Sequence, residues 1–595
     1  MQSKVLEHRK EKWRFRKETI ALGGILFVGC LVRLIALSSN PMGLHQDEAY
    51  SAYNAWSVLY YGVDSYGYTR PVYYTVWGSG MSVLYSYLTM PFLTLFGTEV
   101  WAIRLPQAIL GCLTILAVYG LGKEMYEEKT GLLFALLIAI NPWHIKLSRF
   151  GLDASTAVPF FVFAVYFLCR YLNGKRESLW PAVLCFGFTL YSYALTWVAV
   201  PLFLLCVLIF FRKRISFDRQ LVGGIVILGV MALPLILFLL VNFDLIPEIR
   251  TGLFSIPKLP ALRTGEMAIS LGAFKRRFLW LVAMLWSQHD DMWWMTDAKV
   301  GSYYYASVPF FVLGIVYFVK QLLCDIKKKK KMPLYGLLGI WFVLSFALGC
   351  GIDMAKFHKV NLIHIPIILF GGLGVIGSSR ILSRICCHKK KAAIEENVTE
   401  GERGNLSKTG EKTKAFGSSS NECKQKLGKK YKKVQKREWV RKGTVAICLA
   451  IYLVSFCAFC YEQITFPVDY TLYGQSAQSH MHWYKYEKAI DRAEELTKGE
   501  IGIINLNYAN VMLYKKISPW GYLKKVKYDG EDPAFRSVVS IDRYVFNKMP
   551  WEEGTEDMVF VYPYNLEEEI KEAGFETEYV TECYGVAWKK ADSNE

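Results

Sequence analysis

Residues 220–242 read QLVGGIVILGVMALPLILFLLVN, an apolar stretch without a single charged side chain. A helix needs roughly 20 predominantly apolar residues to cross the hydrocarbon core of a bilayer. Stretches of comparable length and composition occur at 19–38, 179–211 and 303–323. The first of these is too long for a signal peptide and does not end like a cleavage site, so we expect a retained helix. The sequence therefore predicts a polytopic α-helical membrane protein.

The apolar blocks predict about eleven membrane-spanning helices. They lie at 19–38, 101–122, 130–147, 156–172, 179–195, 197–211, 220–242, 303–323, 333–350, 360–378 and 443–461. A further block, 77–96, contains Gly78, Gly80 and Pro91, and it either spans the membrane or lies on its surface. If it lies on the surface and the N-terminus is cytosolic, the basic segments that follow all face the cytosol, as the positive-inside tendency requires. We therefore expect 77–96 to be interfacial.

Charge is concentrated in one segment of the chain. The whole chain carries a formal charge of +18, and residues 380–442 hold 19 Lys and Arg against seven Glu. Such a run is compatible with nucleic-acid binding, but a cytosolic loop near anionic lipid explains it better. We expect membrane lipid as a partner and no nucleic acid. The expected domains are a transmembrane core at 1–380, a basic cytoplasmic linker at 381–442, a final transmembrane helix at 443–461 and an outer domain at 466–595.

The outer C-terminal segment differs from the rest of the chain because it is polar and acidic, with 15 Lys and Arg against 23 Asp and Glu in 466–595. Strand-like apolar runs occur at 501–506 and 558–562, and a helical pattern rich in Glu and Lys covers 484–498. Strands that alternate with a helix predict a small α/β domain.

Two adjacent acids follow the first expected span, in the run His45-Gln46-Asp47-Glu48-Ala49-Tyr50. Neighbouring side chains on a helix or turn point about 100° apart, so only one of the two acids can face a given reacting centre. One reading makes Asp47 a general base and Glu48 a supporting group. The other reading is a helix N-terminus, which favours acids.

Several cations are expected at the same membrane face as Asp47. Arg104 opens the second span, Arg149 follows the third, and His358 and Lys359 precede the tenth. A carboxylate base beside such cations suits a reaction whose leaving group is a lipid phosphate, which these residues would bind. Each cation alone could instead snorkel at the interface, and this is the favoured reading for Lys146.

Further polar residues at this face are expected to bind substrate. They are His45, Tyr50, Asp153 and Asp290. Asp290 lies in the run SQHDDMWW at 287–294, where acidic and aromatic residues suit sugar binding or an aromatic belt equally well. His144 and Asp153 are too few for a metal site, so we expect no metal and no other cofactor.

These motifs resemble the protein O-mannosyltransferase and aminoarabinose transferase superfamily. The resemblance runs from Asp47-Glu48 through RPVYY at 70–74 to FGTEVWAIRLP at 96–106 and Gly111, and includes NPWHIKLSRFGLD at 141–153. It covers approximately residues 20–380 in layout. It implies a GT-C membrane glycosyltransferase with a polyprenyl-phosphate sugar donor and an inverting transfer. It also implies Asp47 as the base, Glu48 as its neighbouring acid and Arg104 as a phosphate contact.

The expected function is transfer of a sugar from a polyprenyl-phosphate donor to a cell-envelope acceptor (a glycan, lipid or protein) at the outer face of a bacterial plasma membrane. Loop 243–302 lacks the large insertion of eukaryotic O-mannosyltransferases, which argues against protein mannosylation of that type. One alternative is a transporter or flippase of lipid-linked sugars, although the sequence shows no repeated halves. The other alternative is a scaffold that anchors the outer domain, which would not need clustered ionisable residues.

Overall fold

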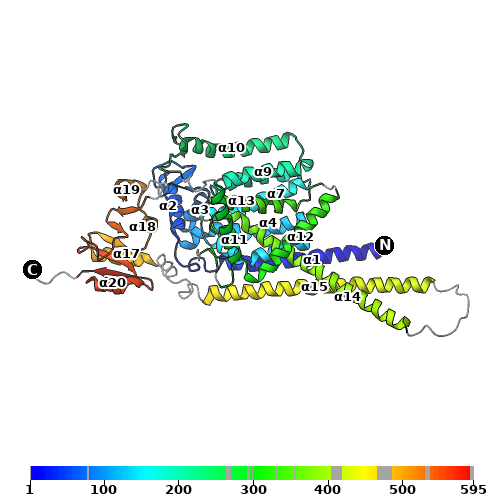
Figure 1. Cartoon of the computed structure of the whole chain (residues 1–595). Coiled ribbons are helices and arrows are strands. Elements are labelled where there is room, and N and C mark those ends of the chain that lie inside the picture. The colour runs from blue at the N-terminus through cyan, green and yellow to red at the C-terminus, as the bar shows by residue number, and fades with distance from the viewer. Residues whose placement is uncertain are drawn as a thin grey trace, which may run out of the picture. The chain divides into compact units, whose positions relative to one another are not determined.

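The computed structural model describes residues 2–76, 79–262, 270–290, 295–297, 299–328, 331–353, 355–403, 419–465, 485–529 and 536–589 (Figure 1). The chain divides into two compact units. Unit 1 comprises Met1–Tyr303, Lys331–Pro366 and Ala458–Glu595, and unit 2 comprises Tyr304–Lys330 and Ile367–Cys457. Unit 1 therefore contains the N-terminal outer loops together with the C-terminal domain.

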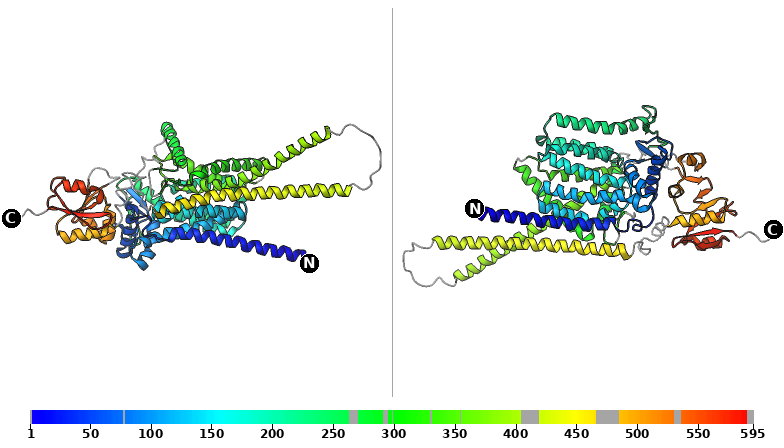
Figure 2. Two further views of the ribbon diagram at one scale, coloured as in Figure 1. Left: turned by 90° about the horizontal axis from the view of Figure 1, so that it is seen from below. Right: turned by 180° about the vertical axis from the view of Figure 1, so that it is seen from behind.

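Long apolar helices form the membrane region of unit 1. They are α1 (Gln2–Leu34), α4 (Val100–Met125), α5 (Glu128–Ala139), α7 (Asp153–Leu172), α8 (Leu179–Leu190), α9 (Thr196–Phe211), α10 (Arg219–Asn242) and α13 (Gly336–Gly351). Helix α4 packs on α5 and α7, and α8 packs on α7 and α10. Figure 1 shows α7, α9 and α10 with their axes roughly aligned, and the same layered arrangement is visible from behind in Figure 2.

Shorter elements join these helices at the end of the bundle where the candidate residues lie. They are α2 (Gln46–Tyr61), the hairpin β1 (Tyr73–Val76) and β2 (Ser79–Ser82), α3 (Leu84–Phe96), α6 (Pro142–Arg149), the hairpin β3 (Ile249–Arg250) and β4 (Ser255–Ile256), and α11 (Leu271–Ser287). Helix α2 is almost entirely buried, and it packs on α3. Asn141 caps the start of α6, where its side-chain oxygen accepts the His144 N–H.

A mixed sheet of seven strands forms the core of the C-terminal domain. Its order is β10 (Glu576–Tyr579), β11 (Tyr584–Trp588), β9 (Val559–Pro563), β5 (Ile501–Ile503), β8 (Tyr544–Phe546), β7 (Val538–Ile541) and β6 (Val526–Tyr528). Strand β5 pairs parallel with β8 and β9, and the other pairs are antiparallel. The helices of the domain are α17 (Tyr486–Leu496), α18 (Tyr508–Tyr514), α19 (Pro519–Lys525) and α20 (Glu567–Glu572).

Unit 2 contains α12 (Val308–Lys327) and most of α14 (His364–Arg403) and α15 (Ser419–Thr465). Glycines bring α12 and α14 into close contact, since a Cβ on Gly314 would overlap the Phe370 carbonyl and one on Gly374 would overlap the Phe310 carbonyl. Small residues serve this purpose in membrane helix pairs, where close backbone approach replaces the hydrophobic effect as a source of stability.

Within the described residues, seven helices are long and apolar enough to cross a membrane. They are Val100–Met125, Asp153–Leu172, Thr196–Arg214, Arg219–Asn242, Tyr305–Lys327, Asn361–Cys386 and Gln435–Gln463. The pair α5 and α6 passes the same test together, with a bend of 62° between them, and would make an eighth span. The predicted polytopic helical class is confirmed.

The number of such helices is smaller than the expected eleven. Helices α8 and α13 have 12 and 16 residues, which is short for a span, and the apolar part of α1 contains Arg33 near its end. The block expected at the membrane surface, 77–96, forms part of a hairpin and the 13-residue helix α3, which is too short to span. The expected α/β domain is confirmed by β5, β9 and α17, and the sheet has more strands than the two runs indicated.

Candidate active site

The first outer loop enters α2 through a capping box formed by His45 and Glu48. The Nδ1 atom of His45 accepts the Asp47 N–H at 3.1 Å, and Glu48 Oε2 accepts the His45 N–H at 3.1 Å. This reciprocal arrangement satisfies backbone donors that a helix N-terminus otherwise leaves without partners. Both acids therefore lie in the first turn of a helix, and that turn is fixed by its own hydrogen bonds.

Glu48 forms a bidentate ion pair with Arg104 of α4. The Glu48 Oε1 and Oε2 atoms accept from Arg104 Nε at 2.9 Å and Nη2 at 2.8 Å, and both side chains are fully buried. Glu48 Oε1 also accepts the Gly151 N–H at 2.7 Å. The acid predicted to support the base thus joins α2, α4 and the segment before α7.

Arg104 gives its remaining donors to backbone carbonyls of the first outer loop. The acceptors are Leu37 at 3.0 Å, Pro41 at 2.8 Å and Gly43 at 2.5 Å. A guanidinium has five N–H groups, and these contacts together with Glu48 use all of them. The direct phosphate contact expected for Arg104 therefore does not fit this geometry. Arg104 instead ties the loop that leads to Asp47 onto α4.

Arg149 is engaged in the same way at the end of α1. Its guanidinium donates to the carbonyls of Val32 (2.8 Å), Ile35 (2.7 Å), Ala36 (3.0 Å) and Asn40 (2.9 Å). The last carbonyls of a helix have no partner within the helix, so a buried helix end needs such donors. Arg149 is itself buried and binds the carbonyls at the end of α1, and its expected role as a phosphate ligand stays a prediction.

A third buried arginine, Arg33, was missed by the sequence analysis. Its hydrogen-bond acceptors are Gly29, Ile138, Ala139, His144 Nδ1 and Ser148 Oγ, at 2.7–3.2 Å. An ionisable residue inside an apolar stretch is a functional candidate by default, and that signal was available in 19–38. With Arg104, Arg149 and Glu48, it forms a buried group of charges that is net positive.

The two adjacent acids differ in exposure. The Asp47 side chain is 30% exposed, whereas that of Glu48 is fully buried. Only one acid of the pair was expected to face a reacting centre, and this difference agrees with that expectation. Asp47 is the acid whose side chain reaches the accessible surface. Its role as the base stays a prediction.

A second loop, residues 355–360, lies near this turn and carries His358 and Lys359. Both side chains are half-buried. Burial, together with the charges of Lys359, His45 and Lys356, lowers the pKa of His358 to about 3. Because His45 is among the groups that act on His358, the structure brings the two expected loops together.

Asp290 holds this second loop in place. Its Oδ2 atom accepts the Phe357 N–H at 2.6 Å, and its carbonyl accepts from Lys356 Nζ at 2.9 Å. Asp290 is also buried. The structure therefore gives Asp290 a positioning role for His358 and Lys359 in place of the expected substrate contact. Residues 291–294 of the same aromatic run lie outside the described residues.

Tyr50 and Asp153 also have structural partners. The Tyr50 hydroxyl lies 3.0 Å from Ser65 Oγ, and the fully buried ring packs edge-on against Tyr508. Asp153 begins α7, and its oxygens accept the N–H groups of Ala154 at 2.6 Å and Ser82 at 3.2 Å. Packing accounts for the position of Tyr50, and hydrogen bonds to two backbone N–H groups account for that of Asp153. Their expected contacts with substrate stay predictions.

Lys146 does not snorkel as expected. It lies 3.6 Å from Asp297 Oδ2 and donates to the Thr296 carbonyl, and both charged side chains are nearly buried. This ion pair fastens α6 to the outer loop before α12. In the part of the chain that the structure describes, no three His, Cys, Asp or Glu side chains gather closely enough to hold a metal ion.

Comparison with known proteins shows what part of this chain is similar to a family of enzymes. Residues 81–241 match the profile of the dolichyl-phosphate-mannose-protein mannosyltransferase family. The chain is a membrane glycosyltransferase of the GT-C fold. The expected superfamily and enzyme class are confirmed, and the match to a family of enzymes favours a glycosyltransferase over a transporter or a scaffold. No curated protein sequence matches the chain closely enough to count as a relative.

Solved structures share the fold of this glycosyltransferase along nearly the whole chain. ArnT from Cupriavidus metallidurans in the apo state is 14% identical, with a TM-score of 0.52, and the match covers 96% of this chain and 97% of ArnT. ArnT bound to undecaprenyl phosphate is 13% identical, with a TM-score of 0.53 and coverage of 96% and 98%. The C-terminal sheet domain is thus included in the shared fold.

The buried histidines of the glycosyltransferase predict acid sensitivity. Burial lowers the pKa of His45 to about 4, below its usual 6.5, as it lowers that of His358. Between pH 6.5 and pH 4 the unfolded chain binds more protons at His45 than the folded chain does. The free energy of unfolding therefore falls as the pH falls. We expect the Tm to drop from pH 7 to pH 5, and His45→Asn to reduce that drop, since Asn still caps α2.

Thermal unfolding of the purified protein in detergent measures this effect. Above pH 7 the curves of Tm against pH for the wild type and His45→Asn should run parallel, because His45 is neutral there in both the folded and the unfolded wild-type chain. An equal loss of Tm on acidification in the two proteins would contradict the assignment of His45 as a buried neutral group.

Proposed function

We propose that this glycosyltransferase transfers a sugar from a polyprenyl-phosphate donor to a hydroxyl of a cell-envelope acceptor, with Asp47 as general base. The observation that carries the proposal is the fixed first turn of α2, which leaves Asp47 partly exposed and buries Glu48. The ArnT structure that shares the fold contains undecaprenyl phosphate, and the matched family is described as using dolichyl-phosphate mannose. Both names support a lipid phosphate as the donor carrier.

The proposed reaction moves one proton and exchanges one bond. Asp47 accepts the proton of the acceptor hydroxyl while that oxygen attacks the anomeric carbon from the face opposite the phosphate. The bond between the anomeric carbon and the phosphate oxygen breaks, and its electron pair leaves with the polyprenyl phosphate. The anomeric configuration is thereby inverted.

Charge at the leaving group is stabilised in two ways in this proposal. Lys359 supplies a direct cation, because it lies beside His358 on the loop that is electrostatically coupled to His45 at the start of α2. The buried arginines supply a fixed positive field, which acts on an anion without a direct hydrogen bond. Groups placed in advance stabilise developing charge without reorganisation during the reaction.

Asp47→Asn tests the base. The substitution keeps the size of the side chain and removes its proton acceptor, so we expect turnover to fall by about 10²- to 10⁴-fold. The assay follows consumption of undecaprenyl-phosphate-linked mannose and glucose by the purified protein with a cell-envelope fraction as acceptor. Glu99→Gln, an exposed acid before α4, is the matched control and should stay within about twofold of the wild type.

Measuring the affinity for undecaprenyl phosphate distinguishes the role of Asp47 as a base from that of Lys359 as a phosphate ligand. Asp47→Asn should bind this lipid with wild-type affinity, whereas Lys359→Gln should bind it about tenfold more weakly. Lys129→Gln, an exposed cation at the start of α5, serves as the control. Near-normal turnover of Asp47→Asn in an assay where the wild type is active would exclude the proposed base.

We further propose that the N-terminus is cytoplasmic and the C-terminal domain extracytoplasmic, in the plasma membrane of a bacterium. The charge distribution supports this orientation because the basic segments then face the cytosol. In a cysteine-free background, Glu553→Cys should react with an impermeant maleimide on intact cells. Lys213→Cys, in the exposed turn after α9, should react only after the cells are opened. The reverse pattern would contradict the orientation.

A further inference from the structure

The two faces of the C-terminal sheet pack against different partners. Side chains alternate between the faces of a strand, and in β9 Val559 and Val561 belong to one apolar cluster while Phe560 and Tyr562 belong to another. The second cluster is completed by residues of the domain itself, such as Ile570 of α20. The first cluster also includes residues from the beginning of the chain.

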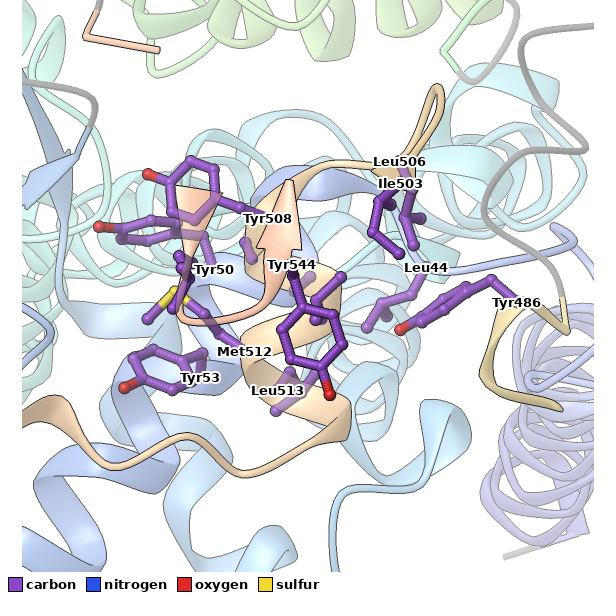
Figure 3. Close-up of a cluster of buried hydrophobic side chains, with 14 of the residues drawn as sticks. Leu44, Tyr50, Tyr53, Tyr486, Ile503, Leu506, Tyr508, Met512, Leu513 and Tyr544 are labelled. Atoms are coloured by element: carbon purple, nitrogen blue, oxygen red, sulfur yellow. The ribbon is translucent and has the colours of Figure 1, made fainter. Parts of the chain in front are cut away.

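Residues from the first outer loop and α2 complete that first cluster. Figure 3 shows Leu44, Tyr50 and Tyr53 among side chains of the C-terminal domain. The domain contributes the labelled residues Tyr486, Ile503, Leu506, Tyr508, Met512, Leu513 and Tyr544. Helix α18 contacts α2 directly, and the rings of Tyr50 and Tyr508 meet edge to face with centroids 6.1 Å apart. The domain and the candidate catalytic loop therefore share one core.

Polar contacts fix the register of this shared core. Asn510 Nδ2 donates to the Leu44 carbonyl at 2.9 Å, and Asn507 Nδ2 donates to Gln46 Oε1 at 3.2 Å. The Tyr53 hydroxyl donates to the Ile517 carbonyl at 2.8 Å. The bond from Asn510 is fully buried, and its acceptor lies immediately before the helix cap His45. Helix α18 therefore holds the backbone at the point where the turn bearing Asp47 begins.

We propose that the C-terminal domain positions the catalytic turn, and that Asn510 is the positioning residue through which α18 fixes residues 44–48. The turn is held from the α4 side by the Arg104–Glu48 pair and from the domain side by Asn510. This inference rests on the proposed function, in which Asp47 is the base. It assigns the domain to the active site, although the domain contributes none of the candidate catalytic residues.

The expected size of the effect follows from the geometry of a base. A displacement of about 1 Å at a reacting group can cost about 10²-fold in rate, even when the substitution lies away from the chemistry. Asn510→Ala leaves the buried Leu44 carbonyl without its donor, so the turn should open more often or shift. We expect a kcat lowered by about 10- to 100-fold and a KM for the donor within about threefold of the wild type.

Amide hydrogen exchange of the full-length protein tests the positioning without an activity assay. In Asn510→Ala, peptides that cover residues 42–52 should exchange at least about tenfold faster than in the wild type. Ile570→Ala is the matched control, because it removes an equally buried side chain from the opposite face of the sheet. It should leave the exchange of residues 42–52 unchanged. No change in Asn510→Ala, or the same change in both variants, would overturn the proposal.

Steady-state kinetics on the same variants complete the test, with undecaprenyl-phosphate-linked mannose or glucose as donor. A fall in kcat without a matching rise in KM in Asn510→Ala, absent from Ile570→Ala, supports the positioning role. Normal kcat in Asn510→Ala would overturn it. If the wild type transfers no sugar from any tested donor, the proposed function fails, and the exchange measurement still decides whether Asn510 positions the turn.

Discussion

The structure around the candidate active site depends on one buried ion pair, Arg104 with Glu48. Taking two charges out of water is costly, and only good geometry with further hydrogen bonds compensates for it. Here both carboxylate oxygens and all five guanidinium N–H groups have partners, and those partners lie on three stretches of chain. The loop after α1, the first turn of α2 and the segment before α7 are thereby joined to α4. The position of Asp47 follows from that junction.

Arg33 and Arg149 extend the same principle to helix ends. Arg33 binds the carbonyls of Ile138 and Ala139 at the end of α5, and Arg149 binds those at the end of α1. In a low-dielectric region each carbonyl needs a donor, and a helix C-terminus favours a positive charge. These arginines thus stabilise the fold and also leave a net positive charge inside this end of the bundle. A single set of residues accounts for both the rigidity of this face and its suitability for an anionic donor.

The sequence predicted features that local patterns encode. The length of the apolar stretches predicted a membrane protein, and the alternation of strand and helix patterns predicted the C-terminal domain. The angle of about 100° between adjacent side chains predicted that Asp47 and Glu48 would face different surroundings. The hydrogen-bond partners of Arg104 and Arg149 were not predictable, because most of them are backbone carbonyls, which every residue type carries. The packing of Tyr50 against Tyr508 was not predictable, because the two residues lie more than 400 positions apart in the sequence. Seven or eight helices of the described residues pass a test of length and apolar composition, fewer than the eleven expected spans, because apolar composition does not reveal where a helix ends.

We propose that Arg104 holds Glu48 and the loop after α1 in place and does not bind the donor phosphate directly. A double-mutant cycle with Arg104→Gln, Glu48→Gln and the combined variant tests it, with Tm and undecaprenyl phosphate binding measured on each protein. Each single substitution should lower the free energy of unfolding by about 3–5 kcal/mol, as is usual when one partner of a buried ion pair is removed. The combined variant should lose less than the sum, and folded protein should bind the lipid within about threefold of the wild type. An Arg104→Gln variant with wild-type stability and lost lipid binding would show instead that Arg104 binds the donor phosphate directly.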